Sequence, residues 1–504
     1  MKMKEWCKNH PNRITFIVLC IFSSIIYMQF ILGHYATDTY TISEVGYDTY
    51  IKSWYLTDGR IFSALFLFII KILNISIEWA NTISILIAIV LSNLAVIQIV
   101  KWIEKYVKIS DFKGKIFLTL ICYTIIWNFT YVENMYFLES SVMALSVLFY
   151  TMTAIKLVEG KKWDNLKALI FIILGIISYQ GTIGFVFILT ALMTFVKNPK
   201  NYKKNIIDII KSGIVAGVAV VGDLEVINIA EKILGTNQRR LGSLANIIPN
   251  FKFMVAYTGD ILKRTCNLYP DYLFIIFSIA IVIILLINLL KQKENTNRFV
   301  IFGKMVILFV LGVFSGSVTY FLTLNGFWAG RLRFAIGSIL GILFLYIATQ
   351  TNLFFAKNKE KNMLPYVAQT VFVIYFLTVI VCNAFCMYEH KQVNKLEEAE
   401  CREILNYINK YEEETQSKVE NIQVITIRDQ ANKTYYSQIY DRNVLTYSGI
   451  RSEWSAVGCI NFYIKKGLVQ KNGDIPDEIF EKIINSDQEE ICIGNTLYVK
   501  CYMY

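Results

Sequence analysis

Long apolar runs separated by short polar segments fill the first four fifths of the sequence. Many approach the ~20 residues that a helix needs to cross ~30 Å of hydrocarbon. We therefore predict a mainly α-helical, polytopic membrane bundle with about 11 spans. Nine of these spans fall near residues 14-32, 80-100, 116-130, 137-155, 206-222, 273-290, 299-323, 334-356 and 366-388.

The other two crossings are short and lie within residues 168-196. This segment joins two lysine-rich loops, so both of its ends should lie on the same side of the membrane. Two half-helices around "SYQGT" (Ser178 to Thr182), forming a tight or re-entrant hairpin, satisfy that condition. Non-helical backbone at such a depth is tolerated only against protein or a water-filled cavity.

Two further segments complete the predicted architecture. The run "IFSALFLFIIKIL" at 61-73 is too short to span comfortably and carries Lys71, which favours an amphipathic helix at the interface. After residue 388 the sequence becomes charged and helical, and then contains the strand patterns "NIQVITI" and "GNTLYVKCY". We predict a transmembrane module over 1-388 and a small α/β domain over 389-504.

The distribution of lysine and arginine orients the spans, because short cytoplasmic loops are enriched in both. The basic segments are 101-115, 156-167, 197-204, 291-298 and 357-361. The N-terminus is then cytoplasmic, and the C-terminal domain lies outside the cell membrane. Residues 33-79, 223-271 and 324-333 also lie on the outer side, and catalytic residues are expected among them.

Composition narrows the function further. Of 504 residues, 55% are hydrophobic and 18% charged, and the net charge of +11 reflects membrane orientation rather than nucleic-acid binding, for which no motif occurs. Three histidines and ten scattered cysteines without CxxC spacing argue against a metal site or a Ser-His-Asp triad. No cofactor or metal site is predicted, and a divalent-ion requirement stays open. A disulfide among Cys459, Cys492 and Cys501 is compatible with an external domain.

Acidic residues gather in the first outer loop, "HYATDTYTISEVGYDTYIKSWYLTDGR". Asp38 follows the first span closely enough to lie near the lipid headgroups, which suits a lipid-linked substrate. A carboxylate within hydrogen-bond reach can deprotonate an acceptor hydroxyl. Asp38, Glu44 and Asp48 are therefore the candidates for a general base, and the alternative is that they are ordinary solvated loop acids.

Arginines on the same side are candidates for phosphate binding. Arg60 closes the acidic loop, Arg239 and Arg240 lie in "NQRRLGS", and Arg331 and Arg333 lie in "WAGRLRF". A guanidinium binds phosphate oxygens bidentately, and arginine beside a span on the outer side runs against the usual charge bias. The alternative for Arg60 is a snorkelling side chain at the end of an apolar run.

Four residues are candidates for substrate contacts: Tyr40, Trp54, Tyr179 and Gln180. The two aromatic residues of the first loop suit stacking on sugar rings or an interfacial belt. Tyr179 and Gln180 lie at the predicted helix break, where they either satisfy the broken helix ends or contact substrate.

Three more acids lie near helix ends on the outer side. Glu133 and Glu139 bracket the turn "YVENMYFLE". Burying either carboxylate there costs free energy unless the side chain is paired or faces a cavity. Asp223 lies near an outer helix end, where a carboxylate costs little, so we give it little weight.

These segments together resemble a known family. "TDTY" after the first span, "GYDTYIKSWYLTDGR", "SYQG" in the broken pair, and the tail segments "GIRSEWSAVGCINFYIKKGL" and "GNTLYVKCY" are similar to the GtrII-like bacterial polytopic glucosyltransferases of GT-C architecture. The resemblance implies transfer of a sugar, expected to be glucose, from a polyprenyl-phosphate carrier to a cell-surface polysaccharide or lipid-linked acceptor.

The resemblance also implies roles and partners. An acid in the first outer loop serves as the base in that superfamily, and the match falls best on Asp38, with Glu44 and Asp48 as alternatives. Asp38 is followed by threonine, where the family usually has a second acid. Arg60 would contact the donor phosphate. The implied partners are the lipid bilayer, the lipid-linked donor and the glycan acceptor, with a flippase and a donor synthase acting beside the enzyme.

Two other functions fit a similar topology. A transporter or flippase of lipid-linked saccharide also needs many spans, basic gates and broken helices, but it does not need acids concentrated in one outer loop. A surface-polysaccharide polymerase or ligase would have one dominant arginine-rich outer loop, which 223-271 matches in part.

Overall fold

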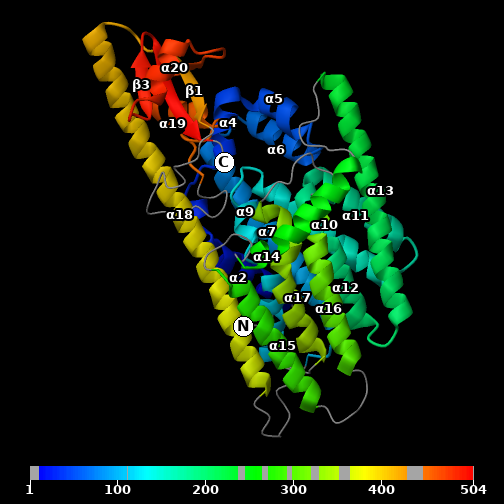
Figure 1. Ribbon diagram of the computed structural model, residues 1–504. Helices are drawn as coiled ribbons and strands as arrows, with labels where there is room; N and C mark the ends of the chain where they lie inside the picture. Colours follow the sequence, from blue (N-terminus) through cyan, green and yellow to red (C-terminus); the bar gives the residue numbers. More distant parts are fainter. Residues whose placement is uncertain are drawn as a thin grey trace, which may run out of the picture.

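The computed structural model describes residues 11–109, 112–235, 244–263, 271–291, 298–318, 329–350, 364–427 and 447–502. Long helices run side by side and form a bundle, and a small unit with a β-sheet lies at one end (Figure 1). Within these ranges, seven helices are long and apolar enough to cross a membrane. The chain is therefore a helical membrane protein in its main part, as the hydropathy predicts.

The helices of the bundle coincide with the predicted apolar runs. They are α2 (Pro11–Ile26), α3 (Met28–Ile31), α7 (Ile77–Glu104), α8 (Phe112–Ile126), α10 (Ser140–Glu159), α11 (Asp164–Ser178), α12 (Phe185–Lys197), α13 (Tyr202–Leu234), α15 (Leu273–Lys291), α16 (Arg298–Ser315), α17 (Phe334–Gln350) and α18 (Leu364–Thr415). Shorter elements connect them: α4 (Thr37–Val45), α5 (Tyr47–Tyr50), the π-helical turn η1 (Ile51–Tyr55), α6 (Ile61–Ile72), α9 (Tyr131–Asn134), the 3-10 turns η2 (Gln180–Thr182), η3 (Leu244–Asn246) and η5 (Gly330–Arg333), and α14 (Ile247–Lys263).

The predicted break at "SYQGT" is present. α11 ends at Ser178, η2 follows, and α12 begins at Phe185. At the far ends of this pair, Lys197 Nζ donates to the carbonyl of Val158 at 2.7 Å, near the end of α10. At the turn, the Tyr150 hydroxyl of α10 donates to the carbonyl of Tyr179 at 3.0 Å. The pair therefore enters and leaves at one end of α10 and turns beside its middle.

A glycine makes this hairpin fit. A Cβ on Gly184, between η2 and α12, would lie 2.0 Å from the carbonyl oxygen of Ser315 at the end of α16. No side chain is tolerated at that distance from backbone, so only glycine lets the two helix ends touch.

Helix α6 forms where a helix was predicted, but it is not amphipathic. Its inner face buries Leu67 and Ile70, while its outer face is also apolar. The exposed side chains include Leu65, Phe68, Ile69 and Ile72. An apolar outer face of this kind is typical of contact with lipid.

Helix α18 is the longest element, with 52 residues, and it runs as one rod along the side of the bundle into the sheet-containing end (Figure 1). It continues through residue 388 without interruption, so the predicted change of character at 388 and 389 falls inside a helix. Beyond its apolar stretch, α18 packs on the remaining C-terminal residues. We call residues 389-502, as far as they are described, the C-terminal unit.

The C-terminal unit has a four-stranded sheet with the strand order β2-β1-β4-β3. The strands are β1 (Asn421–Ile427), β2 (Val469–Gln470), β3 (Glu490–Ile493) and β4 (Thr496–Tyr502), and the helices are α19 (Ala456–Ile464) and α20 (Asp477–Ile484). β1 pairs in parallel with β2 and β4, and β3 pairs antiparallel with β4. Both predicted strand patterns are confirmed, as β1 and β4. Cys459, Cys492 and Cys501 are buried free thiols.

Candidate functional site

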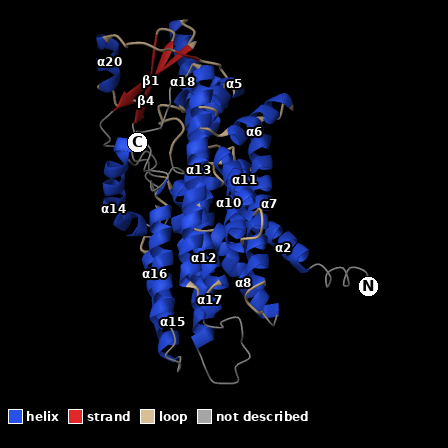
Figure 2. Cartoon of the chain, turned by 90° about the vertical axis from the view of Figure 1, so that its right-hand side faces the viewer, coloured by secondary structure: helices blue, strands red, loops and turns tan. Residues whose placement is uncertain are grey.

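Asp38, Arg60 and Arg331 lie at the end of the bundle that carries the C-terminal unit. There α4, α5 and α6 lie above the long helices and beside the sheet (Figure 1). Figure 2 shows the same end turned by 90°, with the strands, α5 and α6 again gathered above the bundle. The turns η2 and η5 reach this region from within the bundle and contact each other.

Arg60 lies between two carboxylates and an aromatic ring. Its guanidinium is 3.5 Å from the carboxylate of Asp58 and 3.6 Å from that of Glu139, and 5.2 Å from the centre of the Tyr179 ring. The side chain keeps 17% of its surface exposed. Its Nε is buried and has no hydrogen-bond partner within the described part of the chain. Arg60 is thus held by acids and keeps a donor unused.

Gln180 connects the acidic loop to α13. Its Nε2 donates to the backbone carbonyl of Asp58 at 2.7 Å and to Asp223 Oδ2 at 3.2 Å. Gly59 permits the approach, since its φ is +73° and a Cβ there would lie 3.0 Å from Asp223 Oδ1. Asp223, to which its sequence position lent little weight, therefore lies beside Gln180 and the Arg60 loop.

A second charged pair lies at η5. The Arg331 backbone N–H donates to Glu133 Oε2 at 2.9 Å, its guanidinium is 3.9 Å from the same oxygen, and it lies 4.4 Å from the centre of the Phe137 ring. Burial raises the pKa of the Glu133 carboxyl, and the Arg331 charge opposes that rise. Gly330 lets the Glu133 carboxylate approach closely, since a Cβ there would lie 2.8 Å from Glu133 Oε1 and would displace it.

Asp38 lies within electrostatic range of Arg331 and of Glu139, which pairs with Arg60. It lies in the first turn of α4, where the helix dipole favours a carboxylate. Its charge acts on Glu139, on Tyr55 and on Arg331, so it lies within electrostatic range of all three. Asp38, Arg60 and Arg331 thus converge from three segments that are far apart in the sequence, and each is partly exposed.

The other two candidate bases do not face the arginines. Glu44 Oε2 accepts a hydrogen bond from Asn461 Nδ2 of the C-terminal unit at 3.0 Å. Asp48 pairs with Lys71 Nζ at 2.5 Å, and 59% of its side chain is exposed. Of the three acids, Asp38 alone is brought to Arg60 and Arg331.

The remaining predicted site residues are distributed as follows. Tyr40 has no exposed surface and donates from its hydroxyl to Glu397 Oε2 at 2.7 Å, so it is a packing residue rather than a substrate contact. Trp54 stacks on Tyr50, with ring centres 4.8 Å apart. Arg333 is buried beside Glu133. Arg239 and Arg240 lie outside the described residues.

Glu139 is the residue that sequence reasoning undervalued most. Its Oε2 accepts a hydrogen bond from the Tyr55 hydroxyl at 2.9 Å, and its Oε1 faces Arg60. It therefore links η1, the Arg60 loop and α10. The sequence feature that indicated it was its position at the start of an apolar helix, where an unpaired carboxylate costs free energy.

No three His, Cys, Asp or Glu side chains of the described residues gather closely enough to hold a metal ion. The chain matches no family model and no curated protein. The assignment of a function therefore rests on the site.

The C-terminal unit packs against α4, the helix that carries Asp38. Glu397, on the polar part of α18, is buried and accepts hydrogen bonds from Tyr40, from Asn394 Nδ2 at 2.9 Å and from the Gly449 backbone N–H at 2.5 Å. A Cβ on Gly458 of α19 would lie 2.2 Å from the Tyr40 carbonyl oxygen. The contact between α4 and α19 thus depends on close backbone approach.

Glu397 should make stability depend on pH. Burial raises the pKa of its carboxyl to about 7, while the hydrogen bonds from Gly449, Tyr40 and Asn394 oppose the rise. The folded state then binds the proton more tightly than the unfolded state does, so stability falls as the pH rises from about 4.5 to about 7. Each pKa unit of the shift is worth about 1.4 kcal/mol.

We expect Glu397→Gln to flatten this dependence, because glutamine does not titrate. The measurement is the midpoint of thermal unfolding of the detergent-solubilised protein between pH 5 and pH 8. Glu398→Gln, at the exposed neighbouring position, is the matched control and should keep the wild-type slope. Equal slopes in all three proteins would show that Glu397 is not the titrating group.

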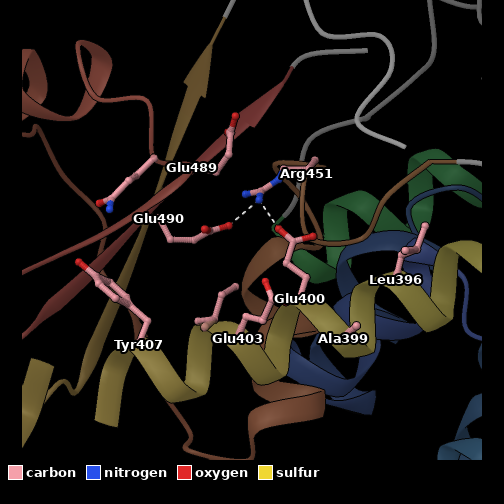
Figure 3. A pocket seen from close by; sticks show the side chains of 10 residues that line it. Leu396, Ala399, Glu400, Glu403, Tyr407, Arg451, Glu489 and Glu490 are labelled. Atoms are coloured by element: carbon pink, nitrogen blue, oxygen red, sulfur yellow. Dashed lines mark hydrogen bonds and ion pairs between the residues drawn. The ribbon is translucent and has the colours of Figure 1, made fainter. Parts of the chain in front are cut away.

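A separate hollow of about 440 Å³ lies between α18 and β3. Figure 3 shows Arg451 at this hollow, reaching between Glu400 and Glu490. Arg451 is 1% exposed, hydrogen-bonds to Glu400, and donates to Glu490 Oε1 at 2.5 Å. It joins α18 to the sheet, and we assign it a structural role in the C-terminal unit.

Proposed function

We propose that this protein is a membrane glycosyltransferase of GT-C type. It moves a sugar, expected to be glucose, from a polyprenyl-phosphate donor to a cell-surface polysaccharide or lipid-linked acceptor. In this proposal the end with the C-terminal unit faces outward, and the N-terminus is cytoplasmic. The observation that carries the proposal is the position of Asp38 within electrostatic range of Arg331 and of Glu139, the carboxylate that pairs with Arg60.

The proposed chemistry is direct displacement at the anomeric carbon. The acceptor hydroxyl loses its proton to Asp38, its oxygen forms the new bond to the sugar, and the bond between the sugar and the phosphate oxygen breaks. The departing phosphate gains negative charge, which Arg60 and Arg331 would neutralise in a site with little water. The unused Nε donor of Arg60 supports this role.

Access for a lipid-linked donor is supported by the surroundings of Arg60. Helix α6, which begins directly after Arg60, has an outer face lined by exposed Leu65, Phe68 and Ile69. A polyprenyl chain packs on apolar surface of this kind, and its phosphate would then lie at the level of the arginine.

The proposal predicts transfer from the lipid-linked donor in a defined system. The protein in proteoliposomes, given polyprenyl-phosphate [14C]glucose and isolated surface glycan, should move label into the glycan. Protein-free liposomes are the control, and nucleotide-linked [14C]glucose without the lipid carrier should label nothing. Label taken directly from the nucleotide sugar, or no labelled glycan at all, would contradict the proposal.

The same proteoliposomes separate transfer from transport. A flippase would carry labelled lipid from the inner to the outer leaflet without any acceptor, and the labelled lipid would become accessible to an external enzyme. Lipid translocation without glycan labelling would replace the transferase proposal with the transporter.

A further inference from the structure

A groove runs along the junction between α4 and the C-terminal unit. It consists of two adjoining cavities of about 570 Å³ and about 420 Å³, a size typical of small-ligand sites. Ser43, Asn461 and Phe462 line both cavities, so the two adjoin along these residues. Neither cavity is lined by Asp38, Arg60 or Arg331.

The lining has the chemistry of a carbohydrate site. Tyr35 and Phe462 are partly exposed aromatic residues of the lining, and their ring centres lie 4.8 Å apart at 57°. Ser43 supplies a hydroxyl, and the side chain of Gln470 supplies an amide. Stacking on apolar ring faces combined with hydrogen bonds to hydroxyls is how an uncharged polar ligand is recognised.

The charges of the groove are nearly balanced. Glu398 pairs with Arg402, and the other charged lining residues are Lys465, Glu78 and Glu44. No excess of positive charge is available for phosphate, nucleic acid or an anionic lipid headgroup. The lining thus favours a neutral ligand.

Hydrogen bonds of Asn461 hold the two walls of the groove in place. Its Nδ2 donates to Glu44 Oε2 at 3.0 Å and to the Leu468 carbonyl at 2.8 Å, and its Oδ1 accepts from the Leu468 N–H at 2.8 Å. These bonds fix α4 to the loop after α19, so both walls of the groove are held before a ligand arrives. Pre-organised walls lower the entropy cost of binding.

We propose that this groove binds a segment of a neutral oligosaccharide chain. Ser43 lies five residues after Asp38 on α4, which corresponds to about 7.5 Å along the helix and about 140° around it. A chain in the groove would therefore be held on another face of the helix that carries Asp38. The identification of this chain as the acceptor glycan rests on the proposed transferase function, whereas the binding site itself does not.

The test uses the full-length protein in nanodiscs and three hexasaccharides as probes: maltohexaose, cellohexaose and laminarihexaose. Isothermal titration calorimetry should detect binding of at least one of them. Phe462→Ala should weaken that binding by about tenfold, because it removes one stacking face. Phe480→Ala is the matched control, since Phe480 is 42% exposed on α20 and lines neither cavity. Both variants are checked for an unchanged unfolding midpoint.

A second variant keeps the test decisive if Phe462→Ala is unstable. Ser43→Trp places a large side chain in the groove at an exposed position and should abolish binding. Absence of binding by all three probes, or equal weakening by Phe480→Ala, would overturn the proposal. In the transfer assay, Phe462→Ala should raise KM for the glycan and leave kcat near wild type. Binding without any transfer would keep the groove and reject the transferase.

Discussion

Replacing Asp38 with asparagine should lower the rate of sugar transfer by at least about 100-fold, the usual loss when a general base is removed. Asparagine keeps the size of the side chain but cannot accept the acceptor proton. Asp38 is partly exposed and lies within electrostatic range of Glu139 and Arg331, so its carboxylate faces the proposed reaction site. The measurement is kcat/KM with labelled donor in proteoliposomes.

The same loop supplies the matched controls. Asp48→Asn removes a carboxylate that is exposed and paired with Lys71, and Glu44→Gln removes one that is bonded to Asn461. Asp48→Asn should keep the wild-type kcat/KM, whereas Glu44→Gln, which loosens Asn461 at the groove, should keep kcat and raise KM for the glycan. Normal transfer by Asp38→Asn, combined with loss in either control, would move the role of base to the other acid.

Replacing Arg60 with methionine should have the second large effect, on both activity and stability. Methionine fills the volume but leaves Asp58 and Glu139 without their cation. Removing one partner of a buried ion pair costs about 3–5 kcal/mol. Loss of a donor to a developing charge lowers kcat by about 10²–10³-fold. Expression, unfolding midpoint and transfer should therefore all fall.

A double variant separates the two effects. Arg60→Met combined with Glu139→Gln removes the uncompensated carboxylate together with its cation and should recover a large part of the lost stability, since residues in direct contact are coupled. Transfer should stay low, because the phosphate contact is still absent. Recovery of transfer along with stability would show that Arg60 acts only as a structural counter-ion.

The helical bundle could be predicted from the sequence, because hydropathy depends on the composition of a window of residues rather than on exact contacts. The helix pair around Ser178–Thr182 followed from the charge of the loops on either side. The amphipathic character expected of α6 was wrong, because Lys71 alone does not make a polar face. Hydropathy predicts that a segment forms a helix, but it says little about whether protein, lipid or water contacts each face of that helix.

Only part of the candidate site could be predicted from the sequence. The sequence favoured Asp38 and kept Glu44 and Asp48 as alternatives, and helix α4 turns Asp38 and Glu44 to different sides while Asp48 lies on α5. Glu139 and Asp223 join the site through α10 and α13, which are remote in the sequence. Buried Glu397 lay in a charged helix that resembled a solvated surface. Each of these contacts arises from tertiary packing, which periodicity does not encode.

The unbroken α18 has a mechanical consequence. With 52 residues it is about 78 Å long, and it carries Glu397, which holds α4 through Tyr40. Helices respond to bilayer thickness by tilting, and a tilt of about 5° displaces a point about 50 Å along a rod by about 4 Å. We therefore expect the thickness of the host membrane to change the position of Asp38, and in the proposed transferase the transfer rate should vary with lipid chain length.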